Sequence, residues 1–504
     1  MKKVVIIGSG LGGLSCGVIL AKNGYDVTVL EQAAQIGGCL QCFSRKGARF
    51  ETGMHFIGSA AKGQTLHRLM NYLEMTGDVQ LMPLDPNGYD VVSLQGQQFR
   101  FANGREAFIE QMAGYFPRQR DNLERYFDLV ERVANASSLH SLKYAETDSM
   151  MDTEFQLRTV NEVIETIVDD PLLAKVLVGN LPLYAARRDK TPFSTHAFIM
   201  DFYNQSAFRI VGGSDRMALS MRRTIERYGG RVYTGCKATR IVCDDTHATG
   251  VEVNGEQLLQ ADIVISDAHP VRTLELLGET HLIRPAFRQR VNNMPQSIGG
   301  FSVYLKFKPN RVRYINNNFY AYAGDTPWGC EDYDETSWPK GFLYMHFCPE
   351  GALSKGADEG LYASTGVVLS YMHMEDVERW EGTRVGHRGA DYEAFKRLKA
   401  ERLIDALEQH FPGIRNDIEN YYTSTPLTYL DYTGTARGSM YGVAKDVALG
   451  AAGRISHRTR VPNVLLTGQN INSHGMLGVM VGTIVTCSEL LTAKTIYEQI
   501  MKNK

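Results

Sequence analysis

Hydrophobic and polar positions near the start of the chain follow first a strand period and then a helix period. Lys3–Ile7 is a short β-branched run, Leu14–Asn23 is an apolar stretch of helical length, and Asp26–Leu30 has the composition of a second strand. The glycine-rich segment Gly8–Gly13 (GSGLGG) joins the first strand to the helix. The pattern predicts strand, tight turn, helix and strand, with the acid Glu31 directly after the last strand.

Apolar residues between positions 106 and 204 mostly recur with the period of a helix, and an aromatic stretch follows at the end of this region. Apolar spacing predicts helices at Ala107–Phe116, Asn122–Asn135, Val160–Asp169 and Pro171–Leu181, after short strands around Val92, Leu94, Phe99 and Phe101. Pro192–Phe208 is unusually aromatic. It is either a core helix or the wall of an apolar substrate tunnel.

The second half of the chain returns to strands. Gly212-Gly213-Ser214 precedes an expected helix at Arg216–Tyr228, and Asn254-Gly255 marks a hairpin. Strands are expected at Arg231–Tyr233, Ala238–Cys243, Gly250–Val253, Ala261–Ser266, Gly299–Lys308, Gly341–Cys348, Gly366–Met372 and Asn463–Thr467, and helices at Tyr392–His410 and Val479–Gln499.

These elements predict an α/β protein with a Rossmann-type domain and an inserted α+β domain. We expect residues 1–85, 205–290 and 440–504 to form a discontinuous FAD-binding domain, and residues 86–204 and 291–439 to form a substrate domain with a helical cap. A length of 504 residues is sufficient for this arrangement. No internal repeat stands out.

Composition and charge exclude several classes of protein. A net charge of −2 gives no electrostatic case for nucleic acid. The glycine-broken N-terminal run is not a secretory segment, and no long uninterrupted apolar stretch predicts a transmembrane helix. The 8 cysteines show no disulfide framework, so we expect a cytoplasmic protein, with peripheral contact with the inner face of a membrane left open.

The glycine turn predicts a dinucleotide site. Gly8 permits the tight turn, Gly10 lets a pyrophosphate approach the backbone, and Gly13 allows close packing of helix on strand. The phosphates then meet the N–H groups at the helix N-terminus. Glu31 can accept hydrogen bonds from ribose hydroxyls and would repel the 2′-phosphate of NADP.

The next segment indicates which dinucleotide is bound. Gly37-Gly38 and the strand-like RFETG around Gly53 replace the helix that a simple NAD enzyme carries here. This pattern resembles FAD-binding proteins of the glutathione reductase and amine oxidase type, in which the loop reaches the flavin. At the other end, a strand leads through Gly468-Gln469-Asn470 to Gly475 and a helix. The class implies that this helix N-terminus stabilises negative charge on reduced flavin.

Four segments carry a closer resemblance, which spans nearly the whole chain. Gly37–Gly58, the helix after Gly212, Pro426–Gly442 and Leu465–Gly482 resemble the retinol saturase branch of the phytoene desaturase and carotenoid isomerase family. The resemblance implies FAD and an apolar conjugated polyene substrate that is desaturated, saturated or isomerised. The expected cofactor-binding residues are Gly8, Gly10, Leu11, Gly12, Gly13, Glu31, Gln32, Gly37, Gly38, Gly53, Met54, His55, Ala238, Gly468, Gln469, Asn470, Gly475, Met476 and Leu477.

Two positions depart from the family pattern. Cys39 stands where desaturases usually carry Arg, and Asn470 stands where saturase-like members carry Asp. A negative partner for the ribityl or phosphate region is therefore missing. If the enzyme reduces its substrate, electrons must come from a transiently bound NAD(P)H or a separate carrier, because no second dinucleotide fingerprint is found.

The candidate catalytic residues are His55, His474 and Tyr441. Histidine can move a proton near neutral pH, as saturation of a double bond requires, but either histidine could instead cap a turn or bind flavin. Tyr441, with Tyr429 and Arg437, belongs to a segment that resembles the family and lines the site or packs in the inserted domain.

Three rival hypotheses of function stay open. Cys39-Leu-Gln-Cys42 has the spacing of a redox disulfide, which would make the chain a thiol-disulfide flavoprotein. An amine oxidase-like enzyme on a small polar substrate and a flavin scaffold without activity are the other two. A metal site is not expected, because no second Cys/His pair has ligand spacing.

Overall fold

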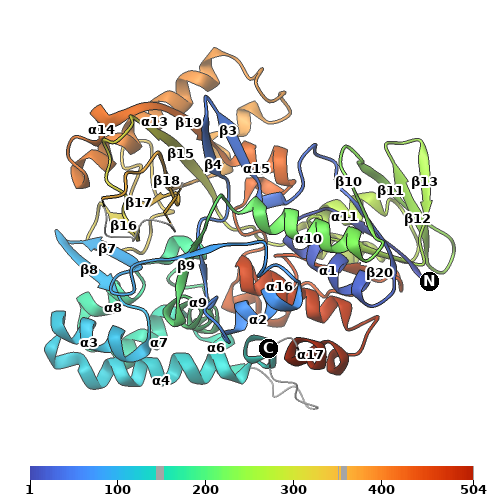
Figure 1. The fold of residues 1–504 in the computed structure, drawn as a ribbon, viewed down its shortest axis with the longest axis horizontal. Helices are drawn as coiled ribbons and strands as arrows, with labels where there is room; N and C mark the ends of the chain where they lie inside the picture. The colour runs from blue at the N-terminus through green and yellow to red at the C-terminus, as the bar shows by residue number, and fades with distance from the viewer. Residues whose placement is uncertain (143–152, 350, 353–359, 503–504) are drawn as a thin grey trace.

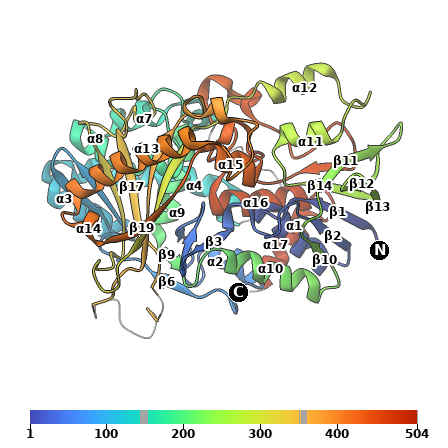
Figure 2. The same cartoon turned by 90° about the horizontal axis from the view of Figure 1, so that it is seen from above.

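The computed structural model describes residues 1–142, 153–349, 351–352 and 360–502. Two sheets organise these residues, a parallel one that carries the N-terminal strand and a larger mixed one (Figure 1). Helices cover both sheets, and the chain passes between the two more than once (Figure 2). This is the predicted α/β architecture.

The parallel sheet is assembled from distant segments of the chain. Its strand order is β10-β2-β1-β14-β20. These strands are β1 (Lys3–Ile7), β2 (Asp26–Leu30), β10 (Arg231–Tyr233), β14 (Ile263–Ser266) and β20 (Val464–Leu466). Their central members are buried on both faces, which explains their nearly unbroken apolar runs. The helices α1 (Leu11–Lys22), α10 (Asp215–Arg227) and α16 (Gly475–Cys487) pack together beside this sheet.

A small antiparallel sheet adjoins the parallel one. It contains β11 (Ala238–Cys243), β12 (Ala248–Val253) and β13 (Gln257–Gln260). The predicted hairpin turn is confirmed, because Asn254 and Gly255 have φ angles of 55° and 76°.

The mixed sheet has seven strands in the order β19-β15-β18-β17-β16-β7-β8. They are β7 (Asp90–Leu94), β8 (Gln97–Phe101), β15 (Gly299–Phe307), β16 (Asn318–Tyr322), β17 (Gly341–His346), β18 (Thr365–Met372) and β19 (Ile418–Ser424). Successive residues of β18 face opposite sides: Val367 and Leu369 join the core under the helical layer, and Val368 packs on the side of α13 (Ala390–His410). Strands β16 and β19 were not among the predicted elements.

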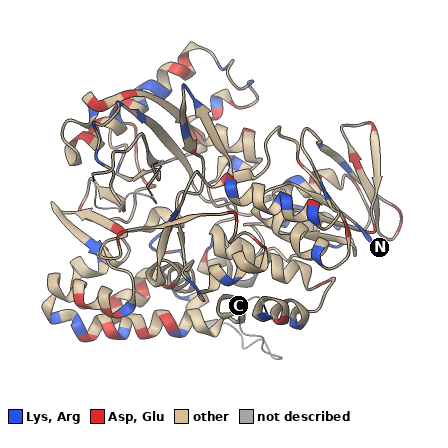
Figure 3. Cartoon of the chain, viewed as in Figure 1, with Lys and Arg blue, Asp and Glu red and all other residues tan. Residues whose placement is uncertain are grey.

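The helical layer confirms the predicted helices with small shifts at their ends. It includes α3 (Arg105–Tyr115), α4 (Arg120–Ala136), α7 (Val160–Ile167), α8 (Pro171–Leu177) and α9 (Phe193–Gln205). Acidic and basic residues are interspersed along α4 (Figure 3). Its apolar side, with Tyr126 and Phe127, packs into the core.

Two predicted helices were too long. The helix expected at residues 479–499 is two helices, α16 and α17 (Ala493–Lys502), because the chain turns at Ser488–Thr492 and the Thr492 hydroxyl accepts a hydrogen bond from the Thr495 N–H at 3.1 Å. The aromatic stretch ends its helix at Gln205, and residues 207–210 form β9 (Ala207–Ile210), which pairs with β5 (Ile57–Gly58) and β6 (Leu81–Pro83). Tertiary pairing overrides local helix propensity there.

The remaining elements connect these layers. They are β3 (Cys42–Arg45), β4 (Ala48–Glu51), α2 (Thr65–Tyr72), α5 (Ser138–Ser141), α6 (Thr153–Leu157), α11 (Pro270–Leu276), α12 (Pro285–Asn292), α14 (Ile414–Asp417) and α15 (Pro426–Thr433), with short 3-10 turns. Among the described ranges, no helix combines the length and apolar character needed to cross a bilayer.

Candidate functional site

Four parallel strands end at the same edge of the sheet, and a residue that follows each strand lines one large cavity. Gly8 follows β1, Glu31 follows β2, Asp267 follows β14, and Gly468 lies two residues after β20. Open α/β sheets bind ligands at the carboxyl ends of their strands. The cavity has a volume of about 790 Å³ and continues from this edge to the mixed sheet.

Most of the residues expected to hold the cofactor lie along this cavity. Its lining includes Gly8, Gly10, Leu11, Gly12, Glu31, Gln32, Gly37, Gly38, Gly53, Met54, His55, Ala238, Gly468, Gln469, Asn470, Gly475, Met476 and also Tyr441. Two of the expected residues do not line it. Leu477 packs in the core beside the parallel sheet, and Gly13 lies behind the glycine turn, where an added Cβ would be 2.1 Å from the Gly8 carbonyl oxygen.

The glycine turn presents an uncapped helix N-terminus to the cavity. The Gly8 N–H donates to the Leu30 carbonyl at 2.8 Å, and a φ of +97° at Gly8 directs the chain into α1. Gly10 is the N-cap of α1 and supplies no side-chain cap. The turn is closed by Gly37, whose N–H donates to the Ser9 carbonyl at 3.0 Å. The N–H of Gly13, in the first turn of α1, donates to the Asp267 carboxyl, and the other N–H groups at this helix start can bind an anion.

The Glu31 carboxylate is fixed at the end of β2. One oxygen accepts hydrogen bonds from the Ser9 N–H at 3.1 Å and the Ser9 hydroxyl at 2.6 Å, and the other accepts from the Ala33 N–H at 2.8 Å. Lys237 and Ala238 line the cavity beside it. This end is therefore polar and suits the ribose and adenine of a nucleotide.

A second carboxyl group, Asp267, sits in the glycine turn, and sequence reasoning missed it. Burial is the main cause that raises the pKa of Asp267 to about 7, and the Glu31 carboxylate adds to the effect, while the N–H groups of Gly13 and Gly10 oppose it. The sequence did carry a signal for Asp267, because this residue directly follows a predicted buried strand, as Glu31 does.

His55 lies on a loop that follows β4 and has a buried acid behind it. Its Nδ1 is 3.5 Å from Oε2 of Glu51, and its carbonyl accepts a hydrogen bond from Arg209 at 3.1 Å. Burial raises the pKa of Glu51, while the charges of His55 and Arg209 lower it. The imidazole thus lies between the cavity and a carboxyl group that can orient it.

The C-terminal segment places a second helix start at the cavity. The N-cap of α16 is His474, which makes no side-chain cap, and Gly475 and Met476 of its first turn line the cavity. Asn470, the departure from the family pattern, directs Oδ1 to the Val443 N–H at 3.0 Å. Its amide oxygen therefore holds the neighbouring loop, and the helix start carries the anion-binding capacity of this end.

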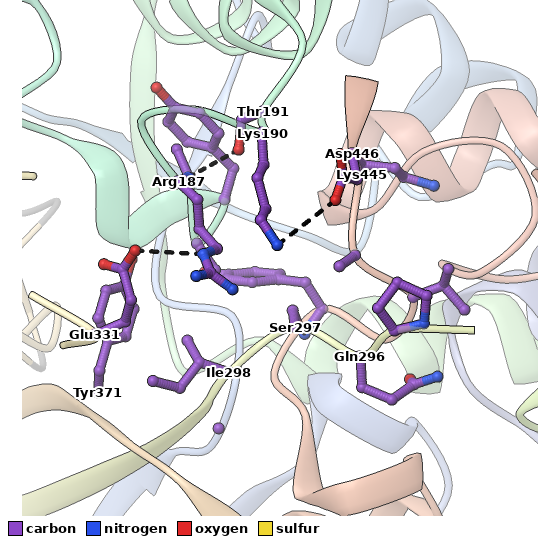
Figure 4. A pocket seen from close by; sticks show the side chains of 18 of the residues that line it. Arg187, Lys190, Thr191, Gln296, Ser297, Ile298, Glu331, Tyr371, Lys445 and Asp446 are labelled. Atoms are coloured by element: carbon purple, nitrogen blue, oxygen red, sulfur yellow. Dashed lines mark hydrogen bonds and ion pairs between the residues drawn. The ribbon is translucent and has the colours of Figure 1, made fainter. Parts of the chain in front are cut away.

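Tyr441 separates the large cavity from a smaller one of about 290 Å³ and lines both. Its hydroxyl donates to the Pro182 carbonyl at 2.8 Å, and its ring lies 4.9 Å from the His474 ring. Burial raises the Tyr441 pKa. Charged side chains line the smaller cavity in pairs, with Arg187 3.5 Å from Glu331 and Lys190 3.8 Å from Asp446 (Figure 4).

His474 is a buried imidazole without a hydrogen-bond partner among the described residues. Its relative exposure is 8%, and neither ring nitrogen is paired. Burial, with a smaller contribution from the Lys445 charge, lowers the His474 pKa to about 3. This histidine is neutral at neutral pH, which separates it chemically from His55, whose neighbour is a carboxyl group.

The far end of the large cavity is apolar. It is lined there by Phe56, Leu183, Tyr203, Leu343, Leu369 and Met440, which come from the segment before β5, the helical layer, the mixed sheet and the segment before β20. Of the aromatic stretch 192–208, only Tyr203 lines this cavity, and most of the other apolar residues of α9 are buried in the core. Most of the stretch is therefore core, and Tyr203 lines the cavity; its part in a substrate tunnel stays a prediction.

The Cys39–Cys42 pair has the wrong electrostatics for disulfide exchange. Both thiols are free. Burial raises the pKa of each to about 11, with Asp267 adding to the effect at Cys39 and Glu51 at Cys42. Exchange requires a thiolate, which these environments disfavour.

Residues 11–311 match the family model of flavin containing amine oxidoreductases. The chain belongs to this family. A solved structure, cyclohexylamine oxidase from Brevibacterium oxydans IH-35A, has the same fold, with a TM-score of 0.60 at 15% identity over 99% of both chains. The predicted amine oxidase-like FAD fold is thereby confirmed, and FAD is the cofactor of this oxidoreductase.

Relatives of known activity cover nearly the whole chain. All-trans-retinol 13,14-reductase from Rattus norvegicus is 29% identical over 98% of this chain and 86% of its own length. Prolycopene isomerase 2 from an Oncidium hybrid cultivar is 21% identical over 98% and 84%, and phytoene desaturase from Cereibacter sphaeroides is 25% identical over 85% and 82%. The resemblance stated from the sequence is confirmed.

The residues of the large cavity fit FAD. The starts of α1 and α16, which have no side-chain cap, suit its phosphates and the electron-rich edge of its ring. Glu31 and Ala238 lie at the nucleotide end, and Met54, His55 and Met476 lie where the ring would be held. When bound, FAD supplies hydride transfer, and the chain supplies binding, orientation and exclusion of water.

Proposed function

We propose that this FAD-dependent oxidoreductase acts on an apolar conjugated polyene, a carotenoid or a retinoid-like molecule, whose double bonds it saturates, isomerises or desaturates. The observation that carries the proposal is the apolar end of the cofactor cavity, where Leu183, Leu343 and Leu369 face the same space as Met54 and His55. The names of the relatives, a retinol reductase, a carotenoid isomerase and a phytoene desaturase, support it.

The apolar walls would orient the substrate and keep water away. The conjugated chain of a polyene offers no hydrogen bonds, so its position must come from shape and from apolar contact. Tyr203 adds an aromatic side chain from α9, and Met440 adds a flexible one from the segment before β20.

His55 is the residue that we propose moves the proton. Saturation adds a proton as well as a hydride, so a group with a suitable pKa must face the double bond. His55 lines the cavity, and its Nδ1 lies 3.5 Å from Oε2 of Glu51, which can orient the ring toward the substrate. Tyr441 and His474 act as positioning residues in this scheme, because the Tyr441 hydroxyl donates to the Pro182 carbonyl and burial keeps the His474 ring neutral.

We propose that the polyene enters beside α15 from a membrane surface. Tyr432 on this helix is 52% exposed and also lines the large cavity. A tyrosine at a cavity mouth suits the interface between lipid and water. Flotation of the holoenzyme with lipid vesicles tests this contact. Tyr432→Glu is expected to weaken flotation, and unchanged flotation would contradict the entry site.

For the saturating direction we propose that electrons arrive from NAD(P)H bound transiently or from a separate carrier. Rapid mixing of oxidised holoenzyme with NADH, NADPH or a reduced carrier protein distinguishes the donors by the rate at which flavin absorbance is lost. If none of these reduces the flavin, the saturating direction is excluded.

One anaerobic experiment tests the proposed substrate class and the reaction direction. Oxidised and photoreduced holoenzyme are each mixed with all-trans-retinol or with a carotenoid, and products are separated by chromatography. A shortened chromophore with flavin reoxidation indicates saturation, a lengthened chromophore with flavin reduction indicates desaturation, and a new geometric isomer without net redox change indicates isomerisation. If a small primary amine reduces the flavin and no polyene reacts, the proposal fails.

A further inference from the structure

Asp267 occupies the space that three glycines leave open. A Cβ built on Gly10 would lie 2.5 Å from Oδ2 of Asp267, and Cβ atoms built on Gly12 and Gly468 would lie 2.4 Å and 2.5 Å from Oδ1. Both carboxyl oxygens therefore rest on the glycine turn and on the segment after β20. The backbone of Asp267 is fixed as well, because its N–H donates to the Ile7 carbonyl at 2.8 Å.

No cation balances this carboxyl group. Within the described part of the chain, no Lys, Arg or His forms an ion pair with Asp267. The groups that act on it are the N–H groups of Gly10 and Gly13 on the side of α1, the Glu31 carboxylate after β2, and the Cys39 thiol near Gly38. Only the two N–H groups favour its ionised form.

The cofactor brings more negative charge to the same place. The pyrophosphate of FAD is anionic throughout the neutral pH range and binds the N–H groups at the start of α1. An ionised Asp267 would compete for these N–H groups and repel the phosphates, because nearby like charges disfavour ionisation. A protonated Asp267 would avoid the repulsion and offer an O–H donor instead.

We propose that Asp267 is a cofactor-positioning residue that carries a proton while FAD is bound, so that FAD binds with uptake of a proton and binds less tightly as the pH rises. The proposal concerns the cofactor alone and is independent of the substrate. It gives Asp267 a role opposite to that of Glu31, which receives hydrogen bonds from Ser9 and Ala33 as a carboxylate.

The sign of the effect follows from linkage. Burial raises the pKa of Asp267 to about 7 before any phosphate is present, and the phosphates raise it further. Below about pH 7 the group is protonated in both states, and FAD affinity does not depend on it. Above that pH the free protein must take up a proton on binding, so the dissociation constant of FAD rises by up to about tenfold per pH unit.

The test measures FAD release from the full-length holoenzyme by flavin fluorescence on serial dilution, between about pH 6 and pH 9. The wild-type dissociation constant is expected to be flat at the acid end and to rise above about pH 7. Asp267→Asn keeps the size and one acceptor but cannot ionise. It is expected to remove the rise and to bind FAD at least about fivefold more tightly than wild type at the alkaline end.

Asp262→Asn is the matched control, because Asp262 lies just before the same strand and accepts the Lys3 N–H at 2.7 Å, away from the cavity. It should follow the wild-type profile. A merely structural role of Asp267 would shift affinity equally at all pH values. A flat wild-type profile, or an unchanged slope in Asp267→Asn, overturns the proposal.

A second measurement applies if the variant does not fold or if FAD never leaves the protein. The infrared spectrum of wild-type holoenzyme at about pH 8 is expected to contain the C=O stretch of a buried protonated carboxylic acid. The band should shift on exchange into deuterated water, as that of a carboxylic acid does. Absence of such a band overturns the proposal without any variant.

Discussion

The two ends of the large cavity are built in different ways. At the nucleotide end, the surface is mostly the backbone of Gly8, Gly10 and Gly12, and Glu31 and Asp267 are the acids beside it. At the far end, the surface is side chains such as Leu183, Leu343 and Leu369, from segments far apart in the sequence. We therefore expect substitutions of the glycines at the nucleotide end to be poorly tolerated. At the apolar end, side chains can be shortened by one methyl group at a time.

The largest effect is expected where the backbone is closest. A Cβ on Gly13 would lie 2.1 Å from the Gly8 carbonyl oxygen, so Gly13→Ala must displace backbone of β1 or α1. We expect more than about 3 kcal/mol of destabilisation, with loss of bound FAD. Thermal unfolding and flavin absorbance of the purified protein measure both.

Gly114→Ala is the control for this substitution. Gly114 is also helical, in α3, but has nothing within 4 Å of its built Cβ. Its change to Ala should be neutral or stabilising by up to about 1 kcal/mol. Equal losses in the two variants would show that the close approach at Gly13 is unimportant.

At His55, where the two ends of the cavity meet, we expect a small effect on stability and a large effect on the rate of turnover. His55→Gln removes the proposed proton donor beside Glu51, and we expect turnover of a saturable polyene to fall about hundredfold, with FAD retained. His474→Gln should cost less than about tenfold, because its ring is neutral and makes no hydrogen bond within the described residues. Turnover at several pH values is the measurement. A larger loss at His474 would reverse the two roles.

At the apolar end a single truncation should act on the substrate alone. Leu183→Ala removes apolar surface from the cavity wall, and we expect polyene affinity to fall by about 1–2 kcal/mol, roughly five- to thirtyfold, with an unchanged dissociation constant for FAD. Leu172→Ala, a partly buried change in the helical layer that does not line the cavity, should leave both constants unchanged. Loss of FAD from Leu183→Ala would contradict the division of the cavity into two ends.

Near neutral pH the smallest effect is a pH dependence of stability. Burial lowers the pKa of His474 from 6.5 to about 3, so between these pH values the unfolded chain binds a proton that the folded chain does not. Wild type should therefore lose about 1.4 kcal/mol per pH unit through this group as pH falls below about 6.5. His474→Gln should show a correspondingly shallower loss in urea unfolding. The same variant at exposed His281 should leave the slope unchanged, and equal slopes for His474→Gln and wild type would show that His474 is protonated in the folded protein.

The nucleotide end was largely predictable because its parts are local. Lys3–Ile7, the glycine turn and Asp26–Leu30 form one continuous unit, and spacing alone places Glu31. Asp267 was missed because it reaches the turn only when β14 pairs with β1, a contact between residues 263 and 4 that no local pattern reveals. The sequence shows that residue 267 is an aspartate, but it does not show which residues surround Asp267 in the fold.

For the apolar end of the cavity, the sequence predicted an apolar surface but not the residues that form it. The aromatic stretch around Tyr203 indicated a tunnel wall or a core, and only one of its residues lines the cavity. Leu343 and Leu369 carry no chemical signal, because β17 and β18 are buried along nearly their whole length and their apolar runs do not mark which residues face the cavity. The roles of His55, Tyr441 and His474 in catalysis stay predictions, because geometry places them and only kinetics can assign them.

A structure of the holoenzyme with a bound, unreactive polyene tests the central claim most directly. We predict the pyrophosphate at the start of α1, the flavin ring between Met54–His55 and the start of α16, and the polyene along Leu183, Leu343 and Leu369. A polyene in the smaller, charged cavity beside Lys190 and Asp446, or a flavin ring out of reach of His55, would contradict the account.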